Sequence, residues 1–157
     1  MPPKVSKQTK LSLSKASDAV PTVALVTPAT MHPKLIWLYG STGSGKTHYI
    51  HTRYPNAFIK FADCNWKGYK GQDVVAIEDF HVNARKTFQL TFLQWLTNDY
   101  IPVYVAPYKK KCIRPKVFLV TSYYHPTDFR HLKPFMKQFL SNCKIIHCTY
   151  ISALPPP

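Results

Sequence analysis

The sequence predicts an α/β domain of three layers, in which a central parallel sheet is covered by helices on both faces. The apolar runs Val74 to Ile77 and Val117 to Val120 are continuous rather than alternating, as is typical of strands that are covered on both faces of a parallel sheet. Short β-rich runs also alternate along the chain with segments of helical period. This alternation is typical of α/β layers, so we expect a single domain of that class.

The expected elements are short. The runs that favour strands, because they are apolar and rich in β-branched or aromatic residues, are Leu35 to Tyr39, Ala57 to Phe61, Val74 to Ile77, Pro102 to Val105, Val117 to Thr121, and Ile145 to Tyr150. The segments that favour helices are Gly45 to Tyr54, which stops before Pro55, Thr87 to Asn98, and Leu132 to Leu140. In the second of these, Phe88, Phe92, Trp95 and Leu96 recur at helical spacing.

We expect the domain to occupy residues 34–152. Residues 1–33 are rich in Lys, Ser, Thr and Pro and show no sustained period, which predicts a flexible basic arm. Its lysines include Lys4, Lys7, Lys10 and Lys15. The arm binds phosphates, acts as an import signal, or is a plain solvated tail. Residues 153–157 end in a run of prolines and are expected to be a frayed tail.

The charge of the chain is strongly positive. Its 157 residues contain 21 Lys and Arg against 7 Asp and Glu, a formal net charge of +14. Such a field attracts polyanions, so nucleic acid is the first partner to expect, and a charge that serves solubility alone is the alternative. No apolar run approaches the roughly 18 residues that cross a bilayer, so we expect no membrane partner. Four cysteines without paired short spacing favour a reducing, intracellular compartment.

Residues 40–47 fit the phosphate-binding loop pattern, in which two glycines with four residues between them are followed by Lys and a hydroxyl residue. They are Gly40, Ser41, Thr42, Gly43, Ser44, Gly45, Lys46 and Thr47. The loop follows an expected strand and opens an expected helix, so backbone N–H groups and the positive helix end can face a phosphate. We expect Lys46 to contact the β- and γ-phosphates of ATP and the Thr47 hydroxyl to bind Mg²⁺.

Glu78 and Asp79 follow directly on the continuous apolar run Val74 to Ile77. Glu78 is the only glutamate in the chain, and hydrolysis of a nucleotide needs carboxylate near the metal and the attacking water. In a parallel sheet this strand end lies at the same edge as the phosphate loop. The pair is therefore expected to be catalytic rather than surface decoration.

Together these residues resemble the superfamily 3 helicase domain of replication initiator (Rep) proteins of circular single-stranded DNA viruses, such as circoviruses. The resemblance runs from about Lys34 to Ile146, and it includes the segment Trp66, Gly68, Tyr69, Gly71 and Gln72. It implies a P-loop NTPase fold of the AAA+-like kind, with Asp79 as the general base and Glu78 holding Mg²⁺ through water.

The segment from Leu96 to Val105, followed by Lys109, Lys110 and Lys111, resembles the element that this family uses to place a lysine hairpin on DNA. From the residues alone, Lys109 to Lys111 are a concentrated cationic loop between two strands. Such a loop suits phosphate contacts that do not read sequence, and a solvated turn is the alternative.

The chain departs from the family pattern at two places. Tyr123 stands where the family's sensor motif has Asn, and a phenol supplies only part of the donor and acceptor set of an amide. The segment Ser141 to Lys144 contains no Arg where the family offers an arginine finger, and Lys144 cannot make the guanidinium's bidentate contact. We therefore expect weak hydrolysis. We also expect a helicase module without the family's nickase domain, since no paired His-apolar-His motif appears.

The resemblance implies an ATP-dependent motor on single-stranded DNA, with RNA not excluded, that assembles as a ring, most simply a hexamer. A role in viral DNA replication and the basic arm favour the host nucleus. A nucleotide- and nucleic-acid-binding module with little turnover is the main alternative. A small P-loop kinase is a further one, although the scattered arginines do not indicate an Arg-rich lid.

Overall fold

The structure is a computed structural model that describes residues 33–98 and 101–149. Most of the expected basic arm, the end of the last expected strand and the proline tail lie outside the described residues. Within them, none of the helices is long and apolar enough to cross a membrane.

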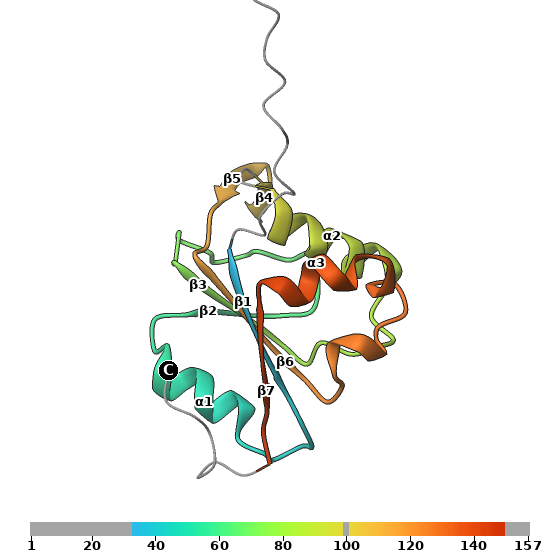
Figure 1. The fold of residues 1–157 in the computed structure, drawn as a ribbon. Coiled ribbons are helices and arrows are strands. Elements are labelled where there is room, and N and C mark those ends of the chain that lie inside the picture. The colour runs from blue at the N-terminus through green and yellow to red at the C-terminus, as the bar shows by residue number, and fades with distance from the viewer. Residues whose placement is uncertain (1–32, 99–100, 150–157) are drawn as a thin grey trace, which may run out of the picture.

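A five-stranded parallel sheet forms the centre of the domain, as the continuous apolar runs predicted (Figure 1). In spatial order its strands are β2 (Phe58–Phe61), β3 (Val74–Glu78), β6 (Val117–Ser122), β1 (Lys34–Tyr39) and β7 (Cys143–His147). β6 thus lies between β1 and β3, which precede it in the chain. This order brings three strand ends together at one edge.

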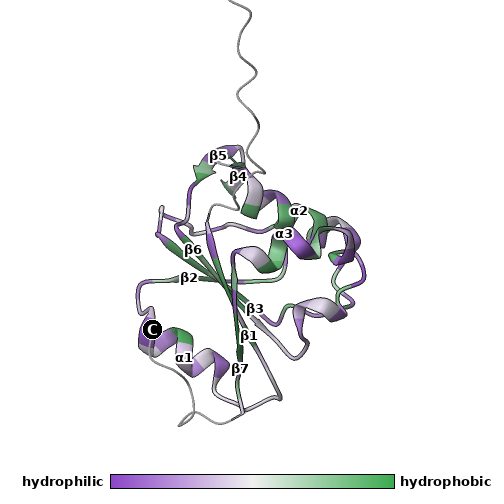
Figure 2. Ribbon diagram, in the orientation of Figure 1, coloured by the Kyte–Doolittle hydropathy of each residue, from purple (hydrophilic) through white to green (hydrophobic). Residues whose placement is uncertain are grey.

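Helices cover both faces of the sheet, which confirms the three layers. α1 (Lys46–Arg53) lies on one face, and α2 (Lys86–Thr97) and α3 (Met136–Ser141) lie on the other (Figure 1). The sheet between them is largely hydrophobic (Figure 2). Each face therefore has its own apolar core.

β1 shows how one strand serves both cores. Leu35 and Trp37 join the larger cluster, which includes the residues of α2, while Ile36 and Leu38 join the smaller one with Ile50 of α1. Because successive side chains of a strand point to opposite faces, a strand between two cores must be apolar at every position. The predicted helical spacing in α2 is confirmed in the same way, since Phe88, Phe92, Trp95 and Leu96 are all buried.

β4 (Ile101–Ala106) and β5 (Lys109–Ile113) form a separate two-stranded antiparallel sheet. The interpretation of Lys109 to Lys111 as a loop was therefore wrong, because these lysines are the first residues of a strand. The hairpin buries alternate apolar residues, among them Val103, Val105 and Ile113, and leaves its other face to solvent. An edge strand of this kind contains polar residues and carries no continuous apolar signal.

The C-terminal elements begin and end at other residues than expected. The last strand runs from Cys143 to His147, earlier than the run Ile145 to Tyr150. The third helix is preceded by a 3₁₀ turn, Lys133–Phe135, with a proline in its first turn. α3 itself starts only at Met136.

Candidate functional site

Three loops meet at the carboxyl edge of the sheet. The loop after β1 begins at Gly40, the loop after β3 at Asp79, and the loop after β6 at Tyr123. Because β6 pairs with both β1 and β3, its end lies between the other two. The carboxyl edge is where open α/β sheets bind ligands.

Ser122 and Thr121, at the end of β6, connect these loops by hydrogen bonds. The Ser122 carbonyl oxygen accepts a bond of 3.1 Å from the Gly40 N–H, and the Ser122 hydroxyl donates one of 2.6 Å to the Phe80 carbonyl oxygen. The Thr121 hydroxyl accepts a bond of 3.1 Å from the Asp79 N–H. Both side chains are buried. The phosphate-binding loop pattern and the acidic pair are therefore held at a fixed separation.

The loop from Gly40 to Gly45 requires glycine at its two ends. A Cβ on Gly40 would lie 2.2 Å from the backbone oxygen of Cys148, a distance that no side chain can occupy. Gly45 has a φ of 91° and is the residue before the first turn of α1, a conformation that glycine adopts without strain. The loop can therefore turn sharply and point the helix N-terminus into the space above it.

The Lys46 ammonium lies inside this loop. It donates hydrogen bonds of 2.7 Å to the carbonyl oxygens of Gly40 and Ser41. It also lies 3.3 Å from Ser44 Oγ. Burial lowers the pKa of Lys46, and the nearby acidic groups Cys148 and Asp79 oppose that effect. The ammonium is thus partly desolvated and aligned by backbone dipoles.

A cavity of about 280 Å³ lies over the loop. It is lined by Gly40, Thr42, Gly43, Gly45, Lys46, Thr47, His48, Asp79, Thr121 and Tyr123. The predicted loop residues Ser41 and Ser44 do not line it, and Ser44 is only 3% exposed. Ser41 contributes its carbonyl oxygen to Lys46 instead. The structure therefore brings most of the predicted loop, the second acidic residue and the sensor position to one cavity.

The two acidic residues differ in their surroundings. Asp79 has a φ of 54°, in the left-handed region that Asp tolerates better than most residues and that is typical of functional sites. It lines the cavity, whereas Glu78 does not. Glu78 Oε1 is buried and has no hydrogen-bond partner within the described residues. A buried carboxylate oxygen without a partner, at the end of β3, and the exposed Thr47 hydroxyl, which lines the cavity, are donors of the kind that fits Mg²⁺, because Mg²⁺ prefers oxygen ligands.

Tyr123 lies at the mouth of the cavity. Its side chain is 61% exposed, and its ring packs against Tyr124 at a centroid distance of 5.3 Å. It also lines an adjoining cavity of about 380 Å³, together with Thr42 and Asp79. The position predicted to be a sensor is therefore beside the predicted base.

Sequence reasoning missed several residues at this edge. His48 and Thr121 line the first cavity, and His81 and Tyr124 line the adjoining one. His81 Nε2 lies 3.2 Å from the Tyr124 hydroxyl. A signal existed for His48 and Thr121, because each is next to a predicted site residue or two residues from it. His81 and Tyr124 are equally near the predicted residues Asp79 and Tyr123, but the contact between them joins residues 43 positions apart and has no signal in the sequence.

The β4–β5 hairpin lies at the opposite end of the sheet from the phosphate loop (Figure 1). Lys109 and Lys110 are exposed, while Lys111 is half-buried. The Lys111 ammonium lies 5.5 Å from the centre of the Tyr69 ring, and a Cβ on Gly71 would lie 3.3 Å from it. The three lysines predicted to bind nucleic acid are therefore not equivalent, since Lys111 packs on the segment that contains Tyr69 and Gly71.

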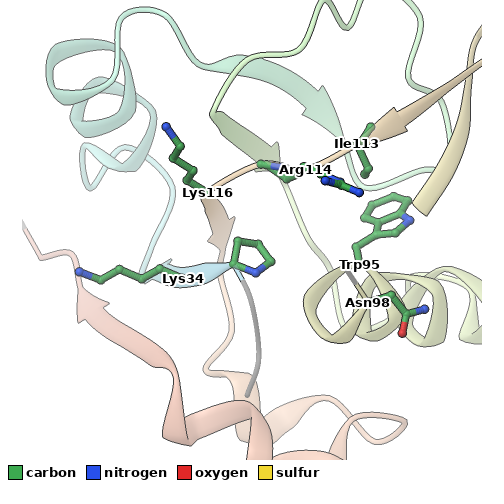
Figure 3. A pocket seen from close by; sticks show the side chains of 8 residues that line it. Lys34, Trp95, Asn98, Ile113, Arg114 and Lys116 are labelled. Carbon is green, nitrogen blue, oxygen red and sulfur yellow. The ribbon is translucent and has the colours of Figure 1, made fainter. Parts of the chain in front are cut away.

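A third cavity, of about 610 Å³, opens at the root of this hairpin (Figure 3). Arg114 points toward Trp95 there, and Lys34 and Lys116 point to the other side. Lys116 pairs with Asp73 at 2.7 Å, and both side chains are exposed. Cationic side chains thus continue from β5 to the beginnings of β6 and β1, and the one before β6, Lys116, is paired with a carboxylate.

A protein-family model described as RNA helicase matches residues 36–124. The matched region contains the phosphate loop, the acidic pair, the hairpin and Tyr123. No curated protein matches the chain.

Proposed function

The chain belongs to the RNA helicase family, and we propose that it hydrolyses ATP to drive movement along single-stranded DNA. The observation that carries this proposal is the cavity at the carboxyl edge, which is lined by Lys46 at the end of the loop after β1, by Asp79 after β3 and by Tyr123 after β6. A helicase-type NTPase domain needs a phosphate cradle, an acidic group and a sensor at one place. The proposed function assigns one of these roles to each loop.

The phosphates of ATP would lie at the N-terminus of α1, where backbone N–H groups and the helix dipole favour negative charge. Lys46 would exchange its carbonyl partners for phosphate oxygens. Asp79 would accept the proton of the attacking water. Mg²⁺, held by Thr47 and Glu78, would neutralise charge that develops on the phosphates.

The exposed lysines of the hairpin support nucleic acid as the second ligand. Lys109 and Lys110 are neighbours on one strand and have no acidic partner within the described residues. Such lysines contact phosphates without reading sequence. We also propose a ring, most simply a hexamer, with the hairpin directed toward its channel, and a role in viral-type DNA replication in the host nucleus. The resemblance to superfamily 3 helicases supports both proposals.

The test is an ATPase assay of the full chain with and without single-stranded DNA, repeated with single-stranded RNA of matched length. The proposal expects hydrolysis that DNA stimulates. Stimulation by RNA alone would replace the proposed substrate with RNA. Absence of hydrolysis under all conditions, with ATP still bound, would favour the alternative below.

The alternative is a module that binds nucleotide and nucleic acid with little turnover. Tyr123 favours it, because it lines the cavity with a phenol, whose single oxygen carries both the donor and the acceptor, whereas an amide carries them on two separate atoms. The exposure of its ring leaves room for a different side chain. The two functions therefore differ at one position that can be changed.

Replacing Tyr123 with Asn is expected to raise ATP hydrolysis, because the amide can hold the attacking water or the γ-phosphate. The measurement is the steady-state rate of hydrolysis for parent and variant, with nucleotide affinity determined in parallel. Tyr124→Asn is the neighbouring control and is expected not to raise the rate. A lower rate for Tyr123→Asn would show that the tyrosine itself supports turnover.

Replacing both Lys109 and Lys110 with Ala is expected to weaken binding of single strands equally for all sequences. Each lost phosphate contact reduces the slope of log K against log salt by about 0.7, so the pair reduces it by about 1.4. Adding Lys111→Ala is expected to change the slope little further, because Lys111 is half-buried beside Tyr69. The Lys110 ammonium also lies over a ring, that of Tyr104, but Lys110 remains exposed.

A salt titration of single-stranded DNA binding measures these slopes. Lys133→Ala with Lys137→Ala removes the same charge from another exposed part of the chain and serves as the control. ATP binding without DNA is expected to survive in every variant. Equal slopes for parent and hairpin variant would place the DNA path elsewhere, with the basic arm as the first candidate.

A further inference from the structure

The turn of the β4–β5 hairpin has an unusual residue at its tip. Ala106 pairs with Lys109, so Pro107 and Tyr108 are the two central residues of the turn. Tyr108 has a φ of 60°, and its relative exposure is 102%. A turn with proline first and a positive φ second normally has glycine or asparagine at the second position.

This arrangement does not help the fold. A bulky residue with positive φ is strained, and glycine would avoid the strain. A fully exposed ring also gains nothing from burial, and within the described residues it packs against no other side chain. The two other tyrosines of this region differ in that respect, because the rings of Tyr104 and Tyr69 each lie under a lysine ammonium. Tyr104 is itself 59% exposed, but the ring of Tyr108 is fully exposed.

The neighbours of Tyr108 indicate what would cover it. Lys109 and Lys110 follow it directly and are exposed. A planar apolar ring beside two cations is complementary to a nucleotide, which joins a flat base to an anionic phosphate. Stacking of bases on aromatic side chains is tolerant of sequence, and it requires a base that is not already stacked within a duplex.

We propose that Tyr108 is a base-stacking residue, whose ring binds the face of one unpaired nucleobase while Lys109 and Lys110 bind the adjacent phosphates. The inference rests on the proposed function, since it needs a hairpin that binds nucleic acid. It adds a contact to the base, which the lysines do not make. It also makes the hairpin select single strands over duplexes.

The test uses the full chain with Tyr108→Ala, Tyr108→Phe and Tyr108→Gly. Phe61→Ala is the control, because Phe61 is another exposed aromatic residue, at 68%, on the edge of the central sheet. The probes are an oligothymidine, an abasic strand with the same number of phosphates, and a duplex of equal length. Affinities are measured at several salt concentrations, and thermal unfolding is followed for each variant.

The proposal expects Tyr108→Ala and Tyr108→Gly to bind oligothymidine about tenfold more weakly than the parent, with an unchanged salt slope. Tyr108→Phe and Phe61→Ala keep the parent affinity. The parent prefers oligothymidine to the abasic strand, and the alanine variant does not. The glycine variant separates the ring from the turn, because glycine suits the positive φ and removes only the aromatic surface.

Two results would overturn stacking while leaving the proposed function intact. One is that the Tyr108→Ala and Tyr108→Gly variants bind oligothymidine with the same affinity as the parent. The other is an equal loss on the abasic strand, which would make Tyr108 a backbone contact or a support of the turn. If the parent hydrolyses ATP but binds neither single strand, the hairpin does not bind nucleic acid. That result would overturn both the proposed role of the hairpin and the stacking of Tyr108.

Discussion

Replacing Lys46 with alanine is expected to lower ATP turnover by at least about tenfold, equivalent to about 1.4 kcal/mol in the activation barrier, and to leave the fold intact. The ammonium lies within the loop, where its partners are the carbonyl oxygens of Gly40 and Ser41. It belongs to neither apolar core. Its loss therefore removes a cation that faces the nucleotide phosphates and removes no core packing.

The measurements are the steady-state ATPase rate, nucleotide affinity and thermal unfolding. Lys86→Ala is the matched control, because Lys86 is the first residue of α2 as Lys46 is the first of α1. Lys86 is exposed, and its variant is expected to keep the parent rate. If the Lys46 variant keeps more than about a tenth of the parent activity, the loop does not bind the reacting phosphates.

The central sheet could be predicted because its signal is local. A strand between two cores is apolar at every position, and Val117 to Val120 shows this without reference to any other part of the chain. The same reasoning failed for β5, which begins with three lysines. β5 is a strand because it pairs with β4. Pairing between two segments does not produce a hydrophobic pattern that can be recognised in either segment alone.

The positions of the loop pattern and of the acidic pair at the ends of their strands could also be predicted, because each is a run of adjacent residues after an apolar strand. The hydrogen bonds of Ser122 could not, since they depend on the position of β6 between β1 and β3. The sequence also does not distinguish Lys111 from Lys109 and Lys110, because its contact with Tyr69 joins distant segments of the chain. What the sequence lacks is the order of the strands, and the strand order decides which loops meet.

Replacing Asp79 with Asn is expected to preserve ATP binding and to abolish hydrolysis. An amide has nearly the shape of a carboxylate, but it cannot take a proton from the attacking water. Asn tolerates the left-handed conformation as Asp does, so the φ of 54° and the hydrogen bond from the backbone N–H to Thr121 are retained. Any loss of turnover is then caused by the loss of the carboxylate and not by a change in the backbone.

Asp73→Asn is the matched control, because Asp73 directly precedes β3 and Asp79 directly follows it. Asp73 forms an exposed ion pair with Lys116, and such pairs contribute little to stability, so this variant is expected to keep the parent rate and melting temperature. Glu78→Gln is measured beside them for the Mg²⁺ dependence of nucleotide binding. Loss of a carboxylate that holds the metal changes this dependence, whereas loss of a general base does not. If Asp79→Asn keeps the parent rate while Glu78→Gln loses it without a change in Mg²⁺ dependence, the base is Glu78, and the roles of the two acidic residues are reversed.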